Sequence, residues 1–310
     1  MKKSVFLGIV VVLAMINTLK GQQDPQYTQY MLNTQVINPA LVGLRGVSTI
    51  GILHRSQWLG LDGAPTTQTL NFSTPLSEKV GIGFSAVNDE IGNGTSQETF
   101  LDAAFSYSIP ISDFANITFG INASAHILNL DFSQLVNFGA ETSLPNVDNR
   151  FTPNFGIGTY LNTDRFYLGL SVPRIFETDH FDNDSEETFL ATERMNFYLI
   201  SGYIFELTRD LKLRPGILLK AVQGAPLSAD ITASILFNER FSFGAAYRLD
   251  SAVSGLFGFQ VSEKLLLGLA YDWETSELGS TRFNDGSFEV FLRFDFITNS
   301  NRRNLGGNFF

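Results

Sequence analysis

Residues 287–296 read S-F-E-V-F-L-R-F-D-F, and this stretch decides the fold class. Successive side chains of a β-strand point to opposite sides. One side of this strand is therefore wholly apolar, while the other carries Glu289, Arg293 and Asp295, with Phe291 as its one apolar residue. Such a strand suits the wall of an outer-membrane barrel, where the apolar side faces lipid and the polar side faces a wet lumen.

The same alternation recurs over nine to eleven residues elsewhere, at 117–127, 227–237, 241–249 and 265–273. This is about the length that a tilted strand needs to cross a bilayer. Short polar turns (77–79, 111–113, 163–165, 208–210, 238–240 and 262–264) alternate with longer connections (88–97, 129–150, 173–193 and 275–285). The pattern predicts an all-β fold, a transmembrane antiparallel up-and-down β-barrel of about fourteen strands over residues 46–297, with the short turns in the periplasm. A soluble β-sandwich is the weaker alternative, because it does not need strands of this length.

The first residues predict export. Lys2 and Lys3 precede an apolar run from Val5 to Ile16 and then a polar stretch, the pattern of a secretory signal peptide over residues 1–21. The run is shorter than the roughly 20 residues of a membrane-spanning helix. The chain has no cysteine, and its net charge of −10 without a basic patch argues against nucleic-acid binding.

Two segments flank the predicted strands. Residues 22–45 are too polar to span a bilayer and are expected to form a plug inside the barrel or a periplasmic extension, while residues 298–310 form a C-terminal tail. Within the first segment, Asn38 is suited to cap a turn and Pro39 fixes its own φ before Ala40. This turn is our candidate for the contact that pins a plug, and an ordinary turn in a tethered extension is the alternative.

Three residues near the top of the first predicted strand are further candidates. Arg55 and Gln57 are expected to share the lumen face, and Trp58 is expected to join an aromatic girdle at the lipid interface. On the lumen face, Arg55 and Gln57 could bond the plug or line a partner site. Arg55 could instead be paired structurally with an acid such as Asp102 or Asp230, and we favour the pairing.

An acidic stretch marks one of the long connections. Carboxylates at Asp179, Asp182, Asp184, Glu186 and Glu187 are candidates for partner recognition, since barrels carry specificity in their outer loops. The stretch lacks the glycine and glutamate spacing of a calcium-binding loop. His126 shares a face with Ser124 and Asn122, but a polar lumen ladder has the same appearance, and no catalytic motif is present. We predict no enzyme activity, no cofactor and no metal.

Four stretches occur in an order that we recognise: D-P-Q-Y-T-Q-Y-M at 24–31, N-P-A-L-V-G at 38–43, R-S-Q-W at 55–58 and G-A-P-T-T-Q-T at 63–69. On these the chain resembles the PorP/SprF family of outer-membrane proteins of the Bacteroidota type IX secretion system. The resemblance is specific over residues 22–80. It implies a non-enzymatic barrel, in contact with lipid, in the outer membrane of a Gram-negative, Bacteroidota-like bacterium. Such a barrel would bind a secreted, adhesin-like surface protein through that partner's C-terminal sorting domain. It would support the partner's export or its anchoring at the cell surface. The resemblance also implies contacts with other secretion components and a role in gliding motility.

Two other functions stay open. The turn at 38–40 also resembles the plug motif of fatty-acid-transporter-like barrels, which implies a channel for hydrophobic molecules. A periplasm-facing scaffold of the secretion or gliding motor is the third possibility. The lumen residues that the pattern identifies are polar and favour the anchor over the channel (Asp102, Ser106, Asn122, Ser124, Asp230 and Thr232).

Overall fold

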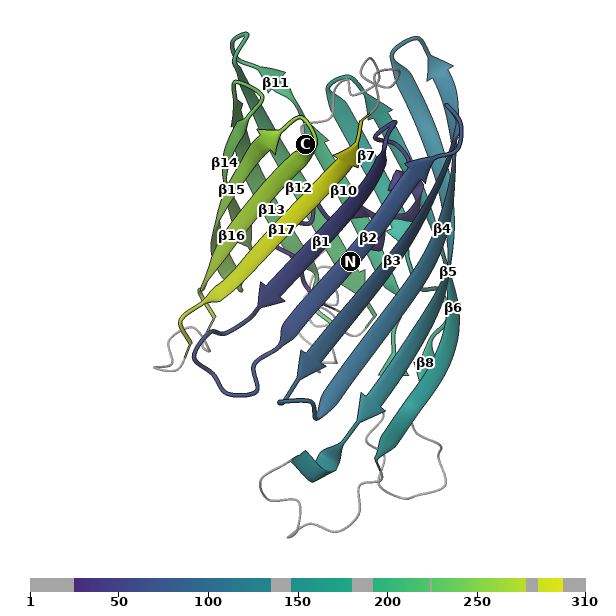
Figure 1. Cartoon of the computed structure of the whole chain (residues 1–310), viewed down its shortest axis with the longest axis vertical. Helices are drawn as coiled ribbons and strands as arrows, with labels where there is room; N and C mark the ends of the chain where they lie inside the picture. Colours follow the sequence, from purple (N-terminus) through teal and green to yellow (C-terminus); the bar gives the residue numbers. More distant parts are fainter. Residues whose placement is uncertain (1–24, 135–145, 180–191, 224, 277–283, 298–310) are drawn as a thin grey trace, which may run out of the picture.

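The chain forms a β-barrel in the computed structural model, which describes residues 25–134, 146–179, 192–223, 225–276 and 284–297 (Figure 1). Strands that follow one another in the sequence lie side by side in the wall. The wall strands are β1 (Ser48–Ser56), β2 (Thr66–Pro75), β3 (Val80–Ile91), β4 (Ser96–Ser112), β5 (Ala115–Leu130), β6 (Val147–Thr163), β7 (Phe166–Val172), β10 (Asn196–Tyr203), β12 (Leu211–Val222), β13 (Ser228–Phe237), β14 (Phe241–Arg248), β15 (Ala252–Ser262), β16 (Leu265–Glu274) and β17 (Ser287–Phe296).

The sheet closes on itself. β1 pairs antiparallel with β17, and β10 pairs with β12. The two-residue strand β11 (Phe205–Glu206) continues β10 after Ile204, because both pair with β12. The predicted fourteen-stranded antiparallel barrel is therefore confirmed. Within the described residues, no helix is long and apolar enough to cross a membrane.

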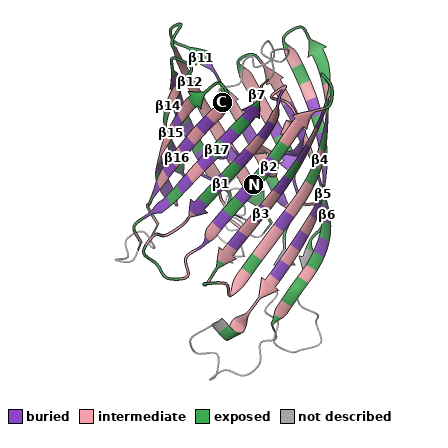
Figure 2. Ribbon diagram, viewed as in Figure 1, coloured by how far each residue is buried: buried purple, intermediate pink, exposed green. Residues whose placement is uncertain are grey.

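Burial alternates along the strands as the sequence predicts (Figure 2). In β17, Glu289, Arg293 and Asp295 are buried, whereas Phe288 and Phe294 on the other face are exposed. The outward apolar side chains form the surface that meets lipid, and the inward polar ones line the lumen. The main apolar core lies inside the barrel, where side chains from residues 27–44, before the first strand, pack on the inner wall.

The connections follow the predicted alternation with two corrections. The predicted long connection 88–97 is mostly strand, because β3 continues to Ile91 and a tight turn with positive φ at Gly92, Asn93 and Gly94 leads into β4. The connection predicted at 129–150 is likewise shorter, since β5 extends to Leu130 and β6 begins at Val147, with a 3-10 turn, η3 (Phe132–Gln134), between them. The connection after β7 carries a separate pairing of β8 (Thr178–Asp179) with β9 (Thr192–Glu193). The predicted signal peptide and C-terminal tail lie outside the described residues.

Candidate functional site

Residues 25–47, which we call the N-terminal segment, lie inside the barrel. Tyr30, Asn33 and Ala40 are almost completely buried, and with Tyr27 and Ile37 they contact the inner wall from several sides. The segment contains two short 3-10 turns, η1 (Thr34–Val36) and η2 (Pro39–Leu41). The barrel wall is a single closed sheet that surrounds the lumen, so the segment inside it decides whether the lumen is open.

A charged cluster attaches the outer half of the segment to the wall, and we call it the charged anchor. Arg55 of β1 donates from Nη2 to Asp272 of β16 at 2.7 Å and from Nη1 to Glu289 of β17 at 3.3 Å. The same Nη1 donates to Oγ1 of Thr28 at 2.7 Å, and that hydroxyl donates to Asp272 at 2.7 Å. The backbone N–H groups of Thr28 and Gln29 donate to the two oxygens of Glu289 at 2.9 and 2.8 Å.

The strand register explains this cluster. Arg55 lies directly opposite Glu289 in the β1–β17 ladder, and Asp272 lies opposite Ser287 in the next ladder. The side chains of Arg55, Asp272 and Glu289 are at most 1 % exposed. Buried charges must be paired, and removing one member of a buried pair costs about 3–5 kcal/mol. In the wall, one guanidinium, that of Arg55, faces two carboxylates, those of Asp272 and Glu289. The N–H groups of Thr28 and Gln29 give Glu289 the additional hydrogen-bond donors that it needs.

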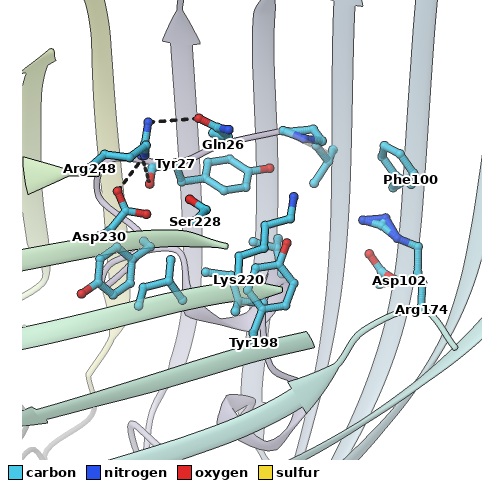
Figure 3. A pocket seen from close by; sticks show the side chains of 16 residues that line it. Gln26, Tyr27, Phe100, Asp102, Arg174, Tyr198, Lys220, Ser228, Asp230 and Arg248 are labelled. Carbon is cyan, nitrogen blue, oxygen red and sulfur yellow. Dashed lines mark hydrogen bonds and ion pairs between the residues drawn. The ribbon is translucent and has the colours of Figure 1, made fainter. Parts of the chain in front are cut away.

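A second ion pair holds the start of the segment. Arg248 of β14 donates from Nε to Asp230 of β13 at 2.7 Å. Its other nitrogens donate to the side chain of Gln26 at 3.1 Å and to the carbonyl of Tyr27 at 3.4 Å. Figure 3 shows Arg248 between its acid and these two acceptors.

The turn at residues 38–40 attaches the segment to the opposite part of the wall. Oδ1 of Asn38 accepts from the N–H of Ala40 at 2.9 Å, and its Nδ2 donates to the carbonyls of Thr159 and Leu170 at 3.1 and 3.4 Å. Asn38 thus caps its own turn and reaches the backbone of β6 and β7. The predicted capping role of this asparagine agrees with the geometry.

Glycines in the wall admit this turn. A Cβ added at Gly120 of β5 would collide with the backbone of Pro39 and Ala40, and one added at Gly158 of β6 would collide with the side chain of Asn38. Further along, Ser106 of β4 donates to the carbonyl of Val42 at 2.7 Å. The turn is therefore seated by close backbone approach, not only by side-chain contacts.

Cavities lie in the lumen on both sides of the segment. The outer cavity, of about 50 Å³, faces the long connections and is lined by Arg174, Lys220, Arg248, Asp102 and Asp230 among others. Arg174 and Phe100 lie next to each other in Figure 3, and the guanidinium carbon is 4.2 Å from the centre of the ring. The inner cavity, of about 170 Å³, lies toward the short turns. Both are far too small for a folded protein domain.

Three expectations about the first strand need correction. Arg55 faces the lumen and is paired, but its partners are Asp272 and Glu289, not Asp102 or Asp230. Asp102 instead accepts from Asn122 at 3.1 Å and from Ser124. Asp230 pairs with Arg248, which leaves neither acid at Arg55.

The chain beyond Ser56 does not continue the strand, so the alternation stops there. Gln57 is not on the lumen face of β1, because it lies in the connection to β2 with its N–H bonded to the carbonyl of Pro65 at 3.0 Å. Trp58 has a φ of 47° and is not part of a lipid-facing girdle. Its side chain is hydrogen-bonded to Glu274, two residues beyond Asp272 on the lumen face of β16. Trp273, 59 % exposed, is the tryptophan on the outer surface.

The predicted partner loop is only partly described. Asp179 ends β8 and is paired with Thr192, whereas Asp182, Asp184, Glu186 and Glu187 lie outside the described residues. The base of this connection is fixed: Oδ1 of Asn154 accepts from the N–H groups of Ile175 and Phe176, each at 2.9 Å. His126 stacks on Phe100 at 4.3 Å between ring centres. Among the described residues, no group of three or more acidic or histidine side chains is placed to hold a metal ion.

The family model for the type IX secretion system membrane protein PorP/SprF matches residues 19–294. The chain belongs to the PorP/SprF family. No curated protein matches it in sequence. This family of secretion-system membrane proteins, together with the barrel fold, places the chain in the outer membrane.

Solved structures share the barrel fold at low sequence identity. A deletion mutant of the TodX monoaromatic hydrocarbon channel has 13% identity over 86% of this chain and 94% of its own, with a TM-score of 0.50. The CymD monoaromatic hydrocarbon channel has 14% identity over 86% and 93%, with a TM-score of 0.49. The outer membrane protein Omp33 of Acinetobacter baumannii has 9% identity over 81% and 100%, with a TM-score of 0.44. The family is one of secretion-system membrane proteins, and two of these structures are of hydrocarbon channels.

Proposed function

We propose that this PorP/SprF barrel binds a type IX-secreted, adhesin-like partner through the partner's C-terminal sorting domain and supports its export or its anchoring at the cell surface. One observation carries the proposal. The N-terminal segment crosses the lumen and is attached to the wall at several points, and the cavities beside it are about 50 and 170 Å³. A barrel closed in this way serves a protein partner at its rim, not through its lumen.

The segment acts as a plug in this proposal. Its charged anchor on β1, β16 and β17 and its turn on β5, β6 and β7 tie opposite parts of the wall to one piece of chain. The wall around the rim is thereby stiffened, and a rigid surface binds with a smaller loss of conformational entropy than a mobile one.

The long-connection rim is the proposed contact surface. The connection between β7 and β10 is the longest between wall strands and carries the acidic stretch from Asp179 to Glu187. Asn154 fixes the start of this connection to β6. Connections held on a rigid scaffold are where barrels place recognition.

Isolation from the native outer membrane tests the proposal. The protein is extracted in mild detergent, and mass spectrometry identifies what accompanies it. One large secreted protein should be recovered, and replacing the acidic residues of 179–187 by Ser and Asn should remove it. Removing residues 298–310 is the matched control and should leave it in place.

The alternatives give different results in the same experiment. Periplasmic motor components in place of a secreted protein would favour a scaffold that acts through the short-turn rim. A barrel that carries only fatty acid or other lipid would favour a channel for hydrophobic molecules. Either result would contradict the anchor proposal.

A further inference from the structure

The inner cavity has a largely apolar and aromatic lining. The N-terminal segment contributes Leu32, Leu41 and Leu44, and β10 contributes Ile200. Four aromatic rings also line it (Tyr30, Tyr160, Tyr167 and Phe291). The volume of about 170 Å³ is comparable with that of an engineered apolar cavity, of about 150 Å³, that accepts benzene. The cavity therefore has room for one phenyl ring, whereas the outer cavity, at about 50 Å³, does not.

The charged residues of this lining already have partners. Arg45 and Arg293 donate to Asp295, at 3.1 and 3.0 Å respectively. Arg214 is also engaged in an interaction. Since the charges are matched within the protein, the cavity is suited to an uncharged, apolar occupant.

The last strand ends beside this cavity. Arg293 of β17 belongs to the lining, and Ile297, four residues later, ends the described chain. At about 3.3 Å per residue, Ile297 is about 13 Å from Arg293 along the chain. The N–H of Ile297 donates to the carbonyl of Asp295 at 3.0 Å, so the chain bends there and does not continue the strand. The C-terminal tail therefore starts close to the cavity.

The tail carries aromatic side chains within reach of the cavity. Residues 298–310 read T-N-S-N-R-R-N-L-G-G-N-F-F. Phe309 is twelve residues beyond Ile297, and an extended chain of that length spans about 40 Å, which exceeds the distance to the cavity. The two arginines at 302–303 precede Phe309 and Phe310 by at least six residues, so they can stay in water while a ring is buried.

We propose that the C-terminal tail of this chain docks into the inner cavity and that one ring of the pair Phe309–Phe310 fills it. The ring lies against the leucines of the N-terminal segment and against Tyr160 and Tyr167, whose ring centres are 6.2 Å apart. Because the tail is tethered beside the cavity, its effective concentration there is in the millimolar range, and the entropic cost of closing the loop grows only slowly with its length. In outer-membrane barrels the short turns face the periplasm, so the docked tail closes the lumen on the periplasmic side.

Engineered disulfides in the full barrel test the proposal, because the natural chain has no cysteine. Asn308→Cys is combined with Leu44→Cys in the cavity lining, or with Lys264→Cys as the matched control. Lys264 is exposed in a short turn, and its carbonyl accepts from the N–H of Asp295 at 2.8 Å, so it too lies beside the end of β17. In nanodiscs, the disulfide to position 44 should form at least about tenfold faster than the disulfide to position 264, because docking raises the effective concentration at position 44 alone. Leu41→Cys is a second lining position for the same measurement.

Tail variants then identify the docked group. Replacing both Phe309 and Phe310 by Ser should slow the disulfide to position 44 about tenfold or more, because the buried ring is lost. Arg302→Gln with Arg303→Gln is the control and should change the rate less than about twofold. Equal rates at positions 44 and 264, an unchanged rate in the double Ser variant, or disulfides that join two barrels would overturn the proposal. Partner binding at the rim is tested separately by co-isolation, where removing residues 298–310 should leave the partner in place, so the two proposals fail independently.

Discussion

Replacing Arg55 by methionine is expected to release the outer half of the N-terminal segment while the barrel stays assembled. Arg55 is the shared partner of Asp272, Glu289 and Thr28 in the charged anchor. The variant leaves two carboxylates close together without a compensating charge. Water must enter, or the carboxylates must be protonated, and the contacts that close the lumen are then lost.

The magnitude follows from the burial of the cluster. Removing one partner of a buried ion pair costs about 3–5 kcal/mol. Since each 1.4 kcal/mol is a factor of ten, the ratio of attached to released segment should fall by about two to three and a half orders of magnitude. The backbone ladder between β1 and β17, from Ser48 opposite Phe296 to Ser56 opposite Phe288, does not depend on the Arg55 side chain.

Single-channel conductance in planar bilayers and proteolysis of the N-terminal segment measure the release. The Arg55→Met variant should conduct and be cleaved, whereas the wild-type protein should do neither. Glu98→Gln is the matched control, because it removes a lumen carboxylate near His126 and leaves the anchor intact. Neutralising the cluster as well, with Asp272→Asn and Glu289→Gln, should restore closure in part.

A closed, protease-resistant Arg55→Met barrel would refute this reasoning. It would mean that the turn at 38–40 and the apolar contacts hold the whole segment, and that the charged anchor contributes little.

Three further predictions concern the seat of the turn and the lipid-facing wall. Gly120→Ala should destabilise the segment by about 1–3 kcal/mol through collision with Pro39, measured as a lower temperature of protease sensitivity. Gly255→Ala, whose added Cβ would meet Trp273 at 3.8 Å, should leave that temperature unchanged. Asn38→Ala should cost about 1–3 kcal/mol in the same assay, since it removes the turn's cap and its bonds to β6 and β7, and no change would contradict the assigned role. Ile121→Arg should cost about 2–4 kcal/mol in folding into lipid vesicles if the residue lies near the bilayer midplane, because its side chain is 59% exposed on the outer surface.

The wall could be predicted from the sequence because alternation is a local signal. In 287–296 each residue's neighbours already determine its face, and the structure has the same faces. The residues at which strands end were harder to predict from the sequence. Trp58 follows Arg55 by three residues, but the strand ends at Ser56 and Trp58 itself has a positive φ, so alternation along the strand no longer places its side chain.

The charged anchor could be predicted only in part from the sequence. An up-and-down barrel closes its first strand on its last, so Glu289 in the closing strand was an available partner for Arg55. The predicted acids, Asp102 and Asp230, were selected from strands further around the wall. Thr28 could not have been found, because its position depends on how a non-repetitive segment packs inside the lumen. Such packing has no period that a sequence pattern reveals.

Site-specific photo-crosslinking in living cells tests the central claim most directly. A photoreactive phenylalanine derivative replaces Glu177, an exposed residue on the long-connection side, or Arg209, an exposed residue in the short turn before β12. A closed barrel that works at its outer rim predicts a crosslink from position 177 to one large secreted protein and none from position 209. Crosslinks from position 209 alone, or from position 177 only to lipid, would contradict it.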